Sequence, residues 1–223
     1  MTDFAAARRM MVDGQVRTSD VTDLRILTAM LELPRERFVP AASAELAYLD
    51  LDIPVSGAGS GAPARRLLKP MVLAKMVQAA AIKAEDRVLD VACATGYSSA
   101  LLGRLARSVV ALEEDPALAR LADESLKAIG ASNVTVVAGP LVQGCQLKAP
   151  YDVILLNGAS EIVPQALCRQ LGEGGRLVAV VGRAPNCRAM VYRSVGGNVS
   201  GWPIFDASAP LLPGFAEPPA FVF

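Results

Sequence analysis

The chain has 223 residues, 52% of them hydrophobic, so it can form one large domain, or one domain with an appendage, around a sizeable core. Its 22 basic and 22 acidic residues cancel, which argues against a general attraction to nucleic acid or to an anionic membrane. The sequence contains no histidine. This removes the commonest general base and metal ligand and any Ser-His or Cys-His nucleophile, and we expect no metal centre.

Targeting and redox signals are equally sparse. No apolar stretch approaches the ~18 residues needed to span a bilayer, and the charged first 18 residues do not resemble a secretory signal. The four cysteines are widely spaced without a C-x-x-C pair, which favours reduced thiols. We therefore expect a cytoplasmic protein with no membrane or nucleic-acid partner.

The first part of the chain is predicted to be helical. Apolar residues recur at helical spacing over residues 4–18 and 23–33, and a short helix is expected over 41–48, with no obvious strand. Residues 54–66 are rich in Gly, Ser, Ala and Pro and predict an exposed loop. A surface linker and a lid or substrate loop explain this segment about equally well.

From Pro70 onward, helices and strands alternate. Alternation of this kind predicts a parallel sheet covered on both faces, so the expected fold is α/β and doubly wound. We expect residues 1–69 to form a helical addition packed on a Rossmann-like domain over 70–223, in one structural unit. The predicted helices are 70–81, 97–106, 116–129 and 161–170; the predicted strands are 88–91, 109–112, 134–138, 153–156 and 176–181, with weaker candidates at 190–194 and 219–223.

A strand, a tight turn and a helix follow one another over residues 87–102. This arrangement builds a nucleotide-type pocket at the carboxyl end of a parallel strand. The usual loop has three glycines, whereas this one has Ala92, Ala94 and Gly96. About 20 residues further on, a second strand ends in Glu113, an acid placed to accept hydrogen bonds from two ribose hydroxyls. The turn alone fits a cofactor site and a ligand-free strand-to-helix connection about equally.

Several neighbouring residues have two interpretations. Asp90 could receive a ligand amino group or could hold the turn through backbone hydrogen bonds. Cys93 lies near a helix N-terminus, but without a histidine a small core thiol is favoured over a nucleophile. Arg65 and Arg66 could be solvated, or could meet a substrate carboxylate if the loop is a lid.

The assembled pattern resembles the protein-L-isoaspartate O-methyltransferase family from about Met10 to Gly182. The string Leu33-Pro34-Arg35-Glu36-Arg37-Phe38-Val39-Pro40 is very similar to the "VPRExFVP" signature of that family. The resemblance implies a class I methyltransferase fold, S-adenosyl-L-methionine as cofactor, and carboxyl methylation of isoaspartyl residues in damaged proteins. It also places the turn from Asp90 to Gly96 at the cofactor. The candidate cofactor-binding residues are therefore Asp90, Ala92, Ala94, Gly96, Glu113, Pro140 and Leu141.

Three departures from the family pattern accompany this resemblance. Leu68 stands where the family's substrate loop has a serine. The turn carries Ala92 and Ala94. Where the family has Gly-Asp-Gly after the third strand, with an acid that reaches the adenine, this chain has Gly139-Pro140-Leu141, and Pro140 cannot accept that hydrogen bond.

Two functional hypotheses follow. The first is a methyltransferase of the isoaspartyl-repair type with weakened cofactor binding and poor or no isoaspartyl methylation, whose acceptor is an isoaspartyl protein or another acidic group. The second is a non-catalytic homologue that keeps the fold as a binding or interaction module. An NAD dehydrogenase is a distant third, because the helical front and the residue 33–40 string argue against it.

Overall fold

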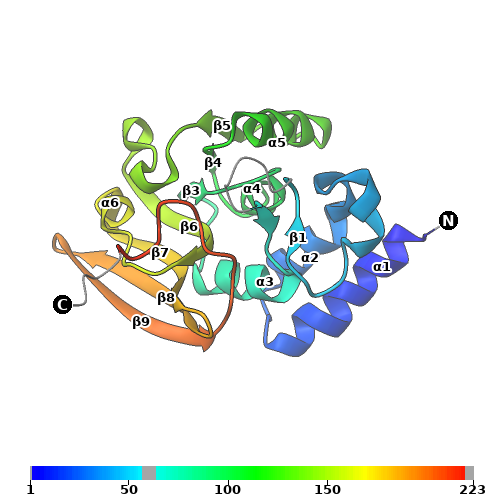
Figure 1. Cartoon of the computed structure of the whole chain (residues 1–223), viewed down its shortest axis with the longest axis horizontal. Helices are drawn as coiled ribbons and strands as arrows, with labels where there is room; N and C mark the ends of the chain where they lie inside the picture. The colour runs from blue at the N-terminus through cyan, green and yellow to red at the C-terminus, as the bar shows by residue number, and fades with distance from the viewer. Residues whose placement is uncertain (1, 57–63, 219–223) are drawn as a thin grey trace.

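A computed structural model describes residues 2–56 and 64–218. A twisted seven-stranded sheet runs through the molecule with helices on both faces (Figure 1). The strand order is β5-β4-β3-β6-β7-β8-β9, and the first five of these strands are parallel. The predicted doubly wound, mainly parallel α/β fold is therefore confirmed.

The parallel strands follow the predicted alternation with helices. Each strand of the parallel part ends at the same edge of the sheet, which gathers the connecting turns there. The elements are α3 Pro70–Ala79, β3 Arg87–Val91, α4 Tyr97–Gly103, β4 Ser108–Glu113, α5 Pro116–Ala128, β5 Val134–Ala138, β6 Tyr151–Ser160, α6 Gln165–Cys168 and β7 Leu171–Arg183.

Two strands extend the sheet in an antiparallel meander. Strand β8, Asn186–Val195, pairs with β7, and β9, Asn198–Asp206, pairs with β8. The candidate strand over 190–194 is confirmed as part of β8. Strand β9 was missed because its alternating pattern is interrupted by Gly201 and Pro203, residues that usually argue against a strand. The candidate over 219–223 lies outside the described residues.

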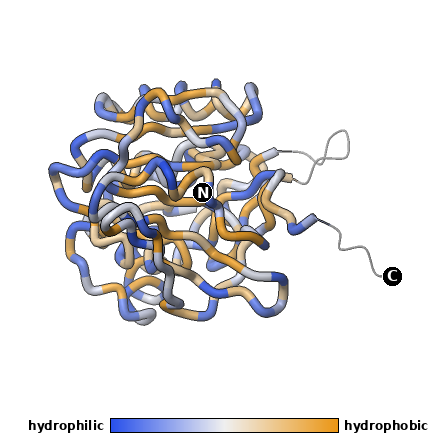
Figure 2. The backbone as a smooth tube through the Cα atoms, turned by 90° about the vertical axis from the view of Figure 1, so that its left-hand side faces the viewer, coloured by the Kyte–Doolittle hydropathy of each residue, from blue (hydrophilic) through white to orange (hydrophobic). Residues whose placement is uncertain are grey.

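Side chains on the two faces of the sheet enter two separate hydrophobic clusters. Val88, Val109 and Val153 face a cluster that includes residues of α3, α4 and α5, whereas Leu89 and Leu112 face the cluster that contains α6. The period of two residues in each strand produces this division. In Figure 2, hydrophobic segments of the backbone run through the middle of the molecule, and many hydrophilic segments lie at its periphery.

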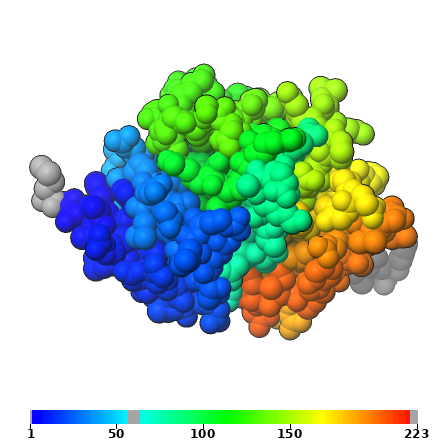
Figure 3. Space-filling model, turned by 180° about the vertical axis from the view of Figure 1, so that it is seen from behind, coloured from blue at the N-terminus to red at the C-terminus, as the bar shows by residue number. Residues whose placement is uncertain are grey.

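The N-terminal segment packs on the face that carries α3 and α4. Its helices are α1 Phe4–Met11 and α2 Leu24–Glu32, and buried residues such as Met11, Ile26 and Phe38 belong to the same cluster as Val88 and Leu101. In the view from behind, the N-terminal residues lie directly against the middle of the chain (Figure 3). The helical addition and the sheet thus share one hydrophobic core.

Several local predictions need correction. The helix expected over 4–18 leaves the α conformation after Met11: a π-helical turn, Val12–Val16, and a 3-10 turn, Arg17–Ser19, follow. The helix over 41–48 is a 3-10 helix, Ala41–Leu46. The helix over 161–170 shrinks to α6, because residues 161–164 form a non-helical connection before it and residues 169–170 a turn after it.

The predicted loop over 54–66 is also only partly a loop. A short antiparallel pair forms between β1, Ile53–Pro54, and β2, Arg66–Leu67, although no strand was expected before Pro70. Val55 and Arg65 are buried, so the ends of this segment are not exposed linker. Among the described residues, no helix is long and apolar enough to cross a membrane.

Candidate functional site

The turn after β3 keeps the backbone of a glycine loop although two of its glycines are absent. Ala92 and Ala94 have φ values of 66° and 52°, in the left-handed region, and Gly96 has a φ of 95°. An L-residue in this region costs roughly 1–2 kcal/mol. The strain at Ala92 and Ala94 indicates that the surrounding fold imposes the path of the turn on these residues.

A side chain at Gly96 would be crowded by helix α5. An added Cβ would lie 3.2 Å from Leu126 and 3.4 Å from Ala122 on α5. Gly96 is also the N-cap of α4. The glycine therefore allows α4 to start close to α5 while the backbone turns through a positive φ.

Glu113 ends β4 and is completely buried. Its Oε2 accepts hydrogen bonds from the Ala94 N–H at 2.7 Å and from the Arg65 guanidinium at 3.2 Å. Its Oε1 accepts from the Glu114 and Asp115 N–H groups at 3.0 and 3.3 Å. The acid thus lies at the predicted strand end, holds the turn through Ala94, and forms an ion pair with Arg65.

Asp90 lies inside a hydrogen-bonded cluster beside the same turn. Its Oδ2 accepts from Ser98 Oγ at 2.7 Å and Ser99 Oγ at 2.5 Å, and its Oδ1 accepts from the Asn157 amide. Burial raises the pKa of Asp90 to about 7, although the three hydrogen bonds oppose the shift. The observed contacts are to side chains, which differs from the backbone role considered for Asp90.

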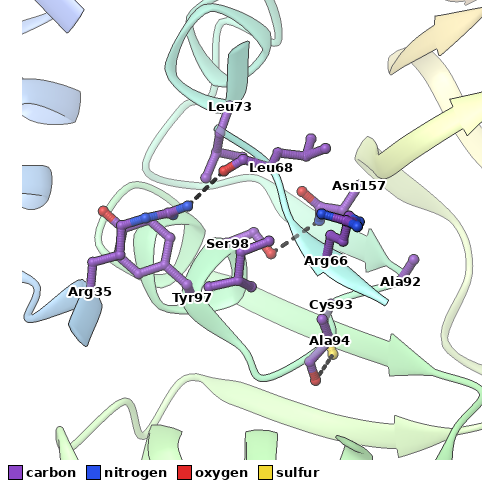
Figure 4. Close-up of a pocket in the computed structure, with 11 residues that line it drawn as sticks. Arg35, Arg66, Leu68, Leu73, Ala92, Cys93, Ala94, Tyr97, Ser98 and Asn157 are labelled. Carbon is purple, nitrogen blue, oxygen red and sulfur yellow. Dashed lines mark hydrogen bonds between the residues drawn. The ribbon is translucent and has the colours of Figure 1, made fainter. Parts of the chain in front are cut away.

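A small cavity lies between this turn and strand β2 (Figure 4). Its volume of about 10 Å³ leaves room for roughly one water molecule. The lining includes Ala92 and Ala94 from the turn and Leu68 from the segment after β2, together with residues that the sequence interpretation had not singled out: Arg35, Leu73, Tyr97, Ser98 and Asn157.

Arg35 is the least expected of these residues, because its charge is fully buried. Its guanidinium donates to the Ala47 carbonyl at 2.8 Å and to the Leu68 carbonyl at 2.7 Å, and lies 4.6 Å from the centre of the Tyr97 ring. Burial lowers the pKa of Arg35. Arg35 lies in the signature-like string of residues 33–40, but its burial depends on contacts 12 and 33 residues away, which spacing alone does not reveal.

Of the remaining predicted site residues, Leu68 and Cys93 line the cavity, whereas Pro140 and Leu141 do not. Leu68 is buried, and its carbonyl rather than its side chain accepts from Arg35. Pro140 is exposed and Leu141 is buried in the cluster beneath α6, and neither lines the cavity. Cys93 is buried and its pKa is raised by that burial, as befits a core thiol.

Comparison with solved structures defines the fold class. A protein-L-isoaspartate O-methyltransferase superposes with a TM-score of 0.79 at 24% identity, covering 93% of this chain and 66% of that one. A Plasmodium falciparum structure assigned to the same methyltransferase, in complex with S-adenosyl-L-homocysteine, gives a TM-score of 0.77 at 16% identity and covers 95% and 99%. The fold is that of a class I methyltransferase.

Sequence relatives identify the family more narrowly. A family model described as protein-L-isoaspartate(D-aspartate) O-methyltransferase matches residues 7–201. The protein-L-isoaspartate O-methyltransferase of Koribacter versatilis is 39% identical over 200 residues, covering 89% of this chain and 87% of the relative. That of Methanoculleus marisnigri is 41% identical over 175 residues, covering 78% and 77%. The chain belongs to the protein-L-isoaspartate(D-aspartate) O-methyltransferase family.

Proposed function

We propose that this protein is an S-adenosyl-L-methionine-dependent carboxyl methyltransferase that acts on isoaspartyl residues of damaged proteins. The observation that carries the proposal is the placement of Glu113 at the end of β4, bonded to the left-handed turn that follows β3. In a Rossmann-like sheet, an acid at this point is positioned for the hydroxyls of a ribose. Membership of the family supports the same assignment.

The residues present suit this reaction. S-adenosyl-L-methionine, when bound, supplies a methyl group on a sulfonium that needs no further activation. An acceptor carboxylate is already ionised at neutral pH. The protein therefore has to position the two partners and exclude water, which is catalysis by proximity and orientation. A general base is not needed, and the absence of histidine is compatible with the activity.

Glu113, Gly96 and Asp90 would hold the cofactor. Glu113 is at the ribose position, the start of α4 after Gly96 would favour an anionic group, and Asp90 offers a carboxyl group beside the cavity. The methyl groups of Ala92 and Ala94 narrow the same space. Ligand sites commonly have volumes of roughly 300–1,000 Å³, so side chains around the cavity must move to admit a cofactor.

The small volume of the cavity and the two strained alanines also favour a second candidate. A non-catalytic homologue would keep the fold and lose the cofactor. Under this alternative, the protein would act as a binding or interaction module, and the turn would keep its glycine path only because β3 and α4 require it.

Two measurements distinguish the candidates. Titration of the protein with S-adenosylhomocysteine in a calorimeter measures cofactor binding directly. Transfer of labelled methyl from S-adenosyl-L-methionine to an isoaspartyl peptide, compared with the same peptide containing normal aspartate, measures the activity. We expect selective transfer at a rate below the ~10 s⁻¹ median of ordinary enzymes. Absence of both binding and transfer at millimolar ligand would refute the methyltransferase and leave the binding module.

A further inference from the structure

Arg65 and Glu113 form the most deeply buried ion pair among the described residues. Only 8% of the Arg65 side chain and none of the Glu113 side chain is exposed. Arg65 immediately precedes β2, whose residues Arg66 and Leu67 line the cavity. The pair therefore joins the acid at the ribose position to the segment that covers the cavity.

The hydrogen bonds of Glu113 leave no acceptor position unused. An ionised carboxylate offers about four lone-pair sites. Two N–H groups occupy Oε1, and Ala94 N–H and Arg65 share Oε2. A ribose hydroxyl that donates a hydrogen bond to Glu113 must therefore displace an existing donor.

Arg65 is the donor that can leave. The other three are backbone N–H groups of Ala94, Glu114 and Asp115, which are fixed by the turn and by the start of α5. The backbone of Arg65 is also fixed, because its N–H donates to Ser56 Oγ at 2.9 Å and its carbonyl accepts from the Val55 N–H at 2.9 Å. Displacement then requires only that the guanidinium rotate away on its flexible side chain.

A guanidinium released in this way still needs an anion. It would lie beside a partly buried cavity, where an unpaired charge is costly. The side chain of Leu68, three residues further along, offers no hydrogen-bonding group for an acceptor. The Arg66 side chain is exposed, and its guanidinium donates to the Asp52 carbonyl. A carboxylate can accept from Arg65 through one oxygen while the other oxygen stays free to react.

We propose that Arg65 exchanges carboxylate partners: it pairs with Glu113 in the free protein and binds the carboxylate of the methyl acceptor once the cofactor ribose occupies Glu113. This inference rests on the proposed function. It makes Arg65 the residue that selects an acidic acceptor, and it orders the two ligands, with the cofactor binding first. Because binding linkage is reciprocal, each ligand then strengthens the binding of the other.

The test uses Arg65→Met, which removes the hydrogen-bond donor but keeps a long side chain. Arg65→Gln, which keeps a neutral donor, is the second variant and replaces the first if Arg65→Met folds poorly. Arg104→Met is the matched control, because it removes an arginine from a surface ion pair with Glu32. Calorimetry with S-adenosylhomocysteine should show about tenfold tighter binding for Arg65→Met, a smaller gain for Arg65→Gln, and no change for Arg104→Met.

A second titration measures an isoaspartyl peptide with and without S-adenosylhomocysteine. In the parent protein, S-adenosylhomocysteine should raise the affinity for the peptide, and in Arg65→Met this gain should disappear. Unchanged or weaker S-adenosylhomocysteine binding by Arg65→Met, with binding intact in the parent, would show that the pair is only structural. Binding by Arg65→Met but not by the parent would support the exchange. No binding by either would overturn both the exchange and the proposed function.

Discussion

The left-handed alanines allow a quantitative test of strain in the turn. Replacing Ala94 with glycine should relieve roughly 1–2 kcal/mol of backbone strain. It should also lose about 0.8 kcal/mol of methyl burial, because Ala94 is 1% exposed, and about 0.4–1 kcal/mol through the greater freedom of the unfolded chain. These contributions nearly cancel, so we expect the free energy of unfolding of Ala94→Gly to stay within about 0.5 kcal/mol of the parent.

Two other alanines provide the matched comparisons. Ala100 is equally buried but lies in α4, so Ala100→Gly loses the methyl and gains nothing, at a cost of roughly 1.5–2 kcal/mol. Ala81 has a φ of 46° and is exposed, so Ala81→Gly relieves strain without losing burial. We expect Ala81→Gly to raise the melting temperature, at about 2–4 °C per kcal/mol for a chain of this size.

Urea unfolding and thermal melting of the four proteins measure these differences. S-adenosylhomocysteine titration adds a second readout, because Ala94 lines the cavity whereas Ala81 and Ala100 do not. Ala94→Gly should bind more tightly than the parent, whereas Ala81→Gly should bind equally. A loss of stability in Ala94→Gly as large as that in Ala100→Gly would refute the argument that the turn is strained.

Three further predictions concern the acid groups and the loop. Because the pKa of Asp90 is raised to about 7, between about pH 4 and 7 the folded protein holds a proton that the unfolded chain has released. The contribution of Asp90 to stability is therefore full below about pH 4 and is lost as the pH rises through 7. Urea unfolding at several pH values should show that the free energy of unfolding declines less steeply with pH in Asp90→Asn than in the parent. Glu113→Ala leaves Arg65 buried without its carboxylate, so it should lower the free energy of unfolding by about 3 kcal/mol. It should also abolish S-adenosylhomocysteine binding, and equal ligand affinity in the variant and the parent would contradict the role given to Glu113. Leu68→Ser replaces a buried apolar side chain with a hydroxyl, so it should lower the free energy of unfolding by about 2–4 kcal/mol. It should increase the rate of methyl transfer to an isoaspartyl peptide. Transfer no faster than in the parent would exclude Leu68 as the cause of weak activity.

The architecture could be predicted from local patterns. The alternation of helices and strands after Pro70, the proline at the start of α3 and the Asp115 cap of α5 are all properties of short segments, and the structure has each of them. The short apolar runs of β3 and β4 likewise indicate where a parallel sheet, buried on both faces, can form. The position of Glu113 at the end of β4 follows from the same local information.

The state of the site was decided by contacts between distant parts of the chain. Arg65 reaches Glu113 across 48 residues, Asn157 reaches Asp90 across 67, and Arg35 bonds to the Leu68 carbonyl across 33. No periodicity encodes such pairings, because they arise only when the sheet and the N-terminal helices pack into one core. The sequence alone therefore determined where a cofactor acid would lie, whereas the tertiary structure decided that an arginine occupies it.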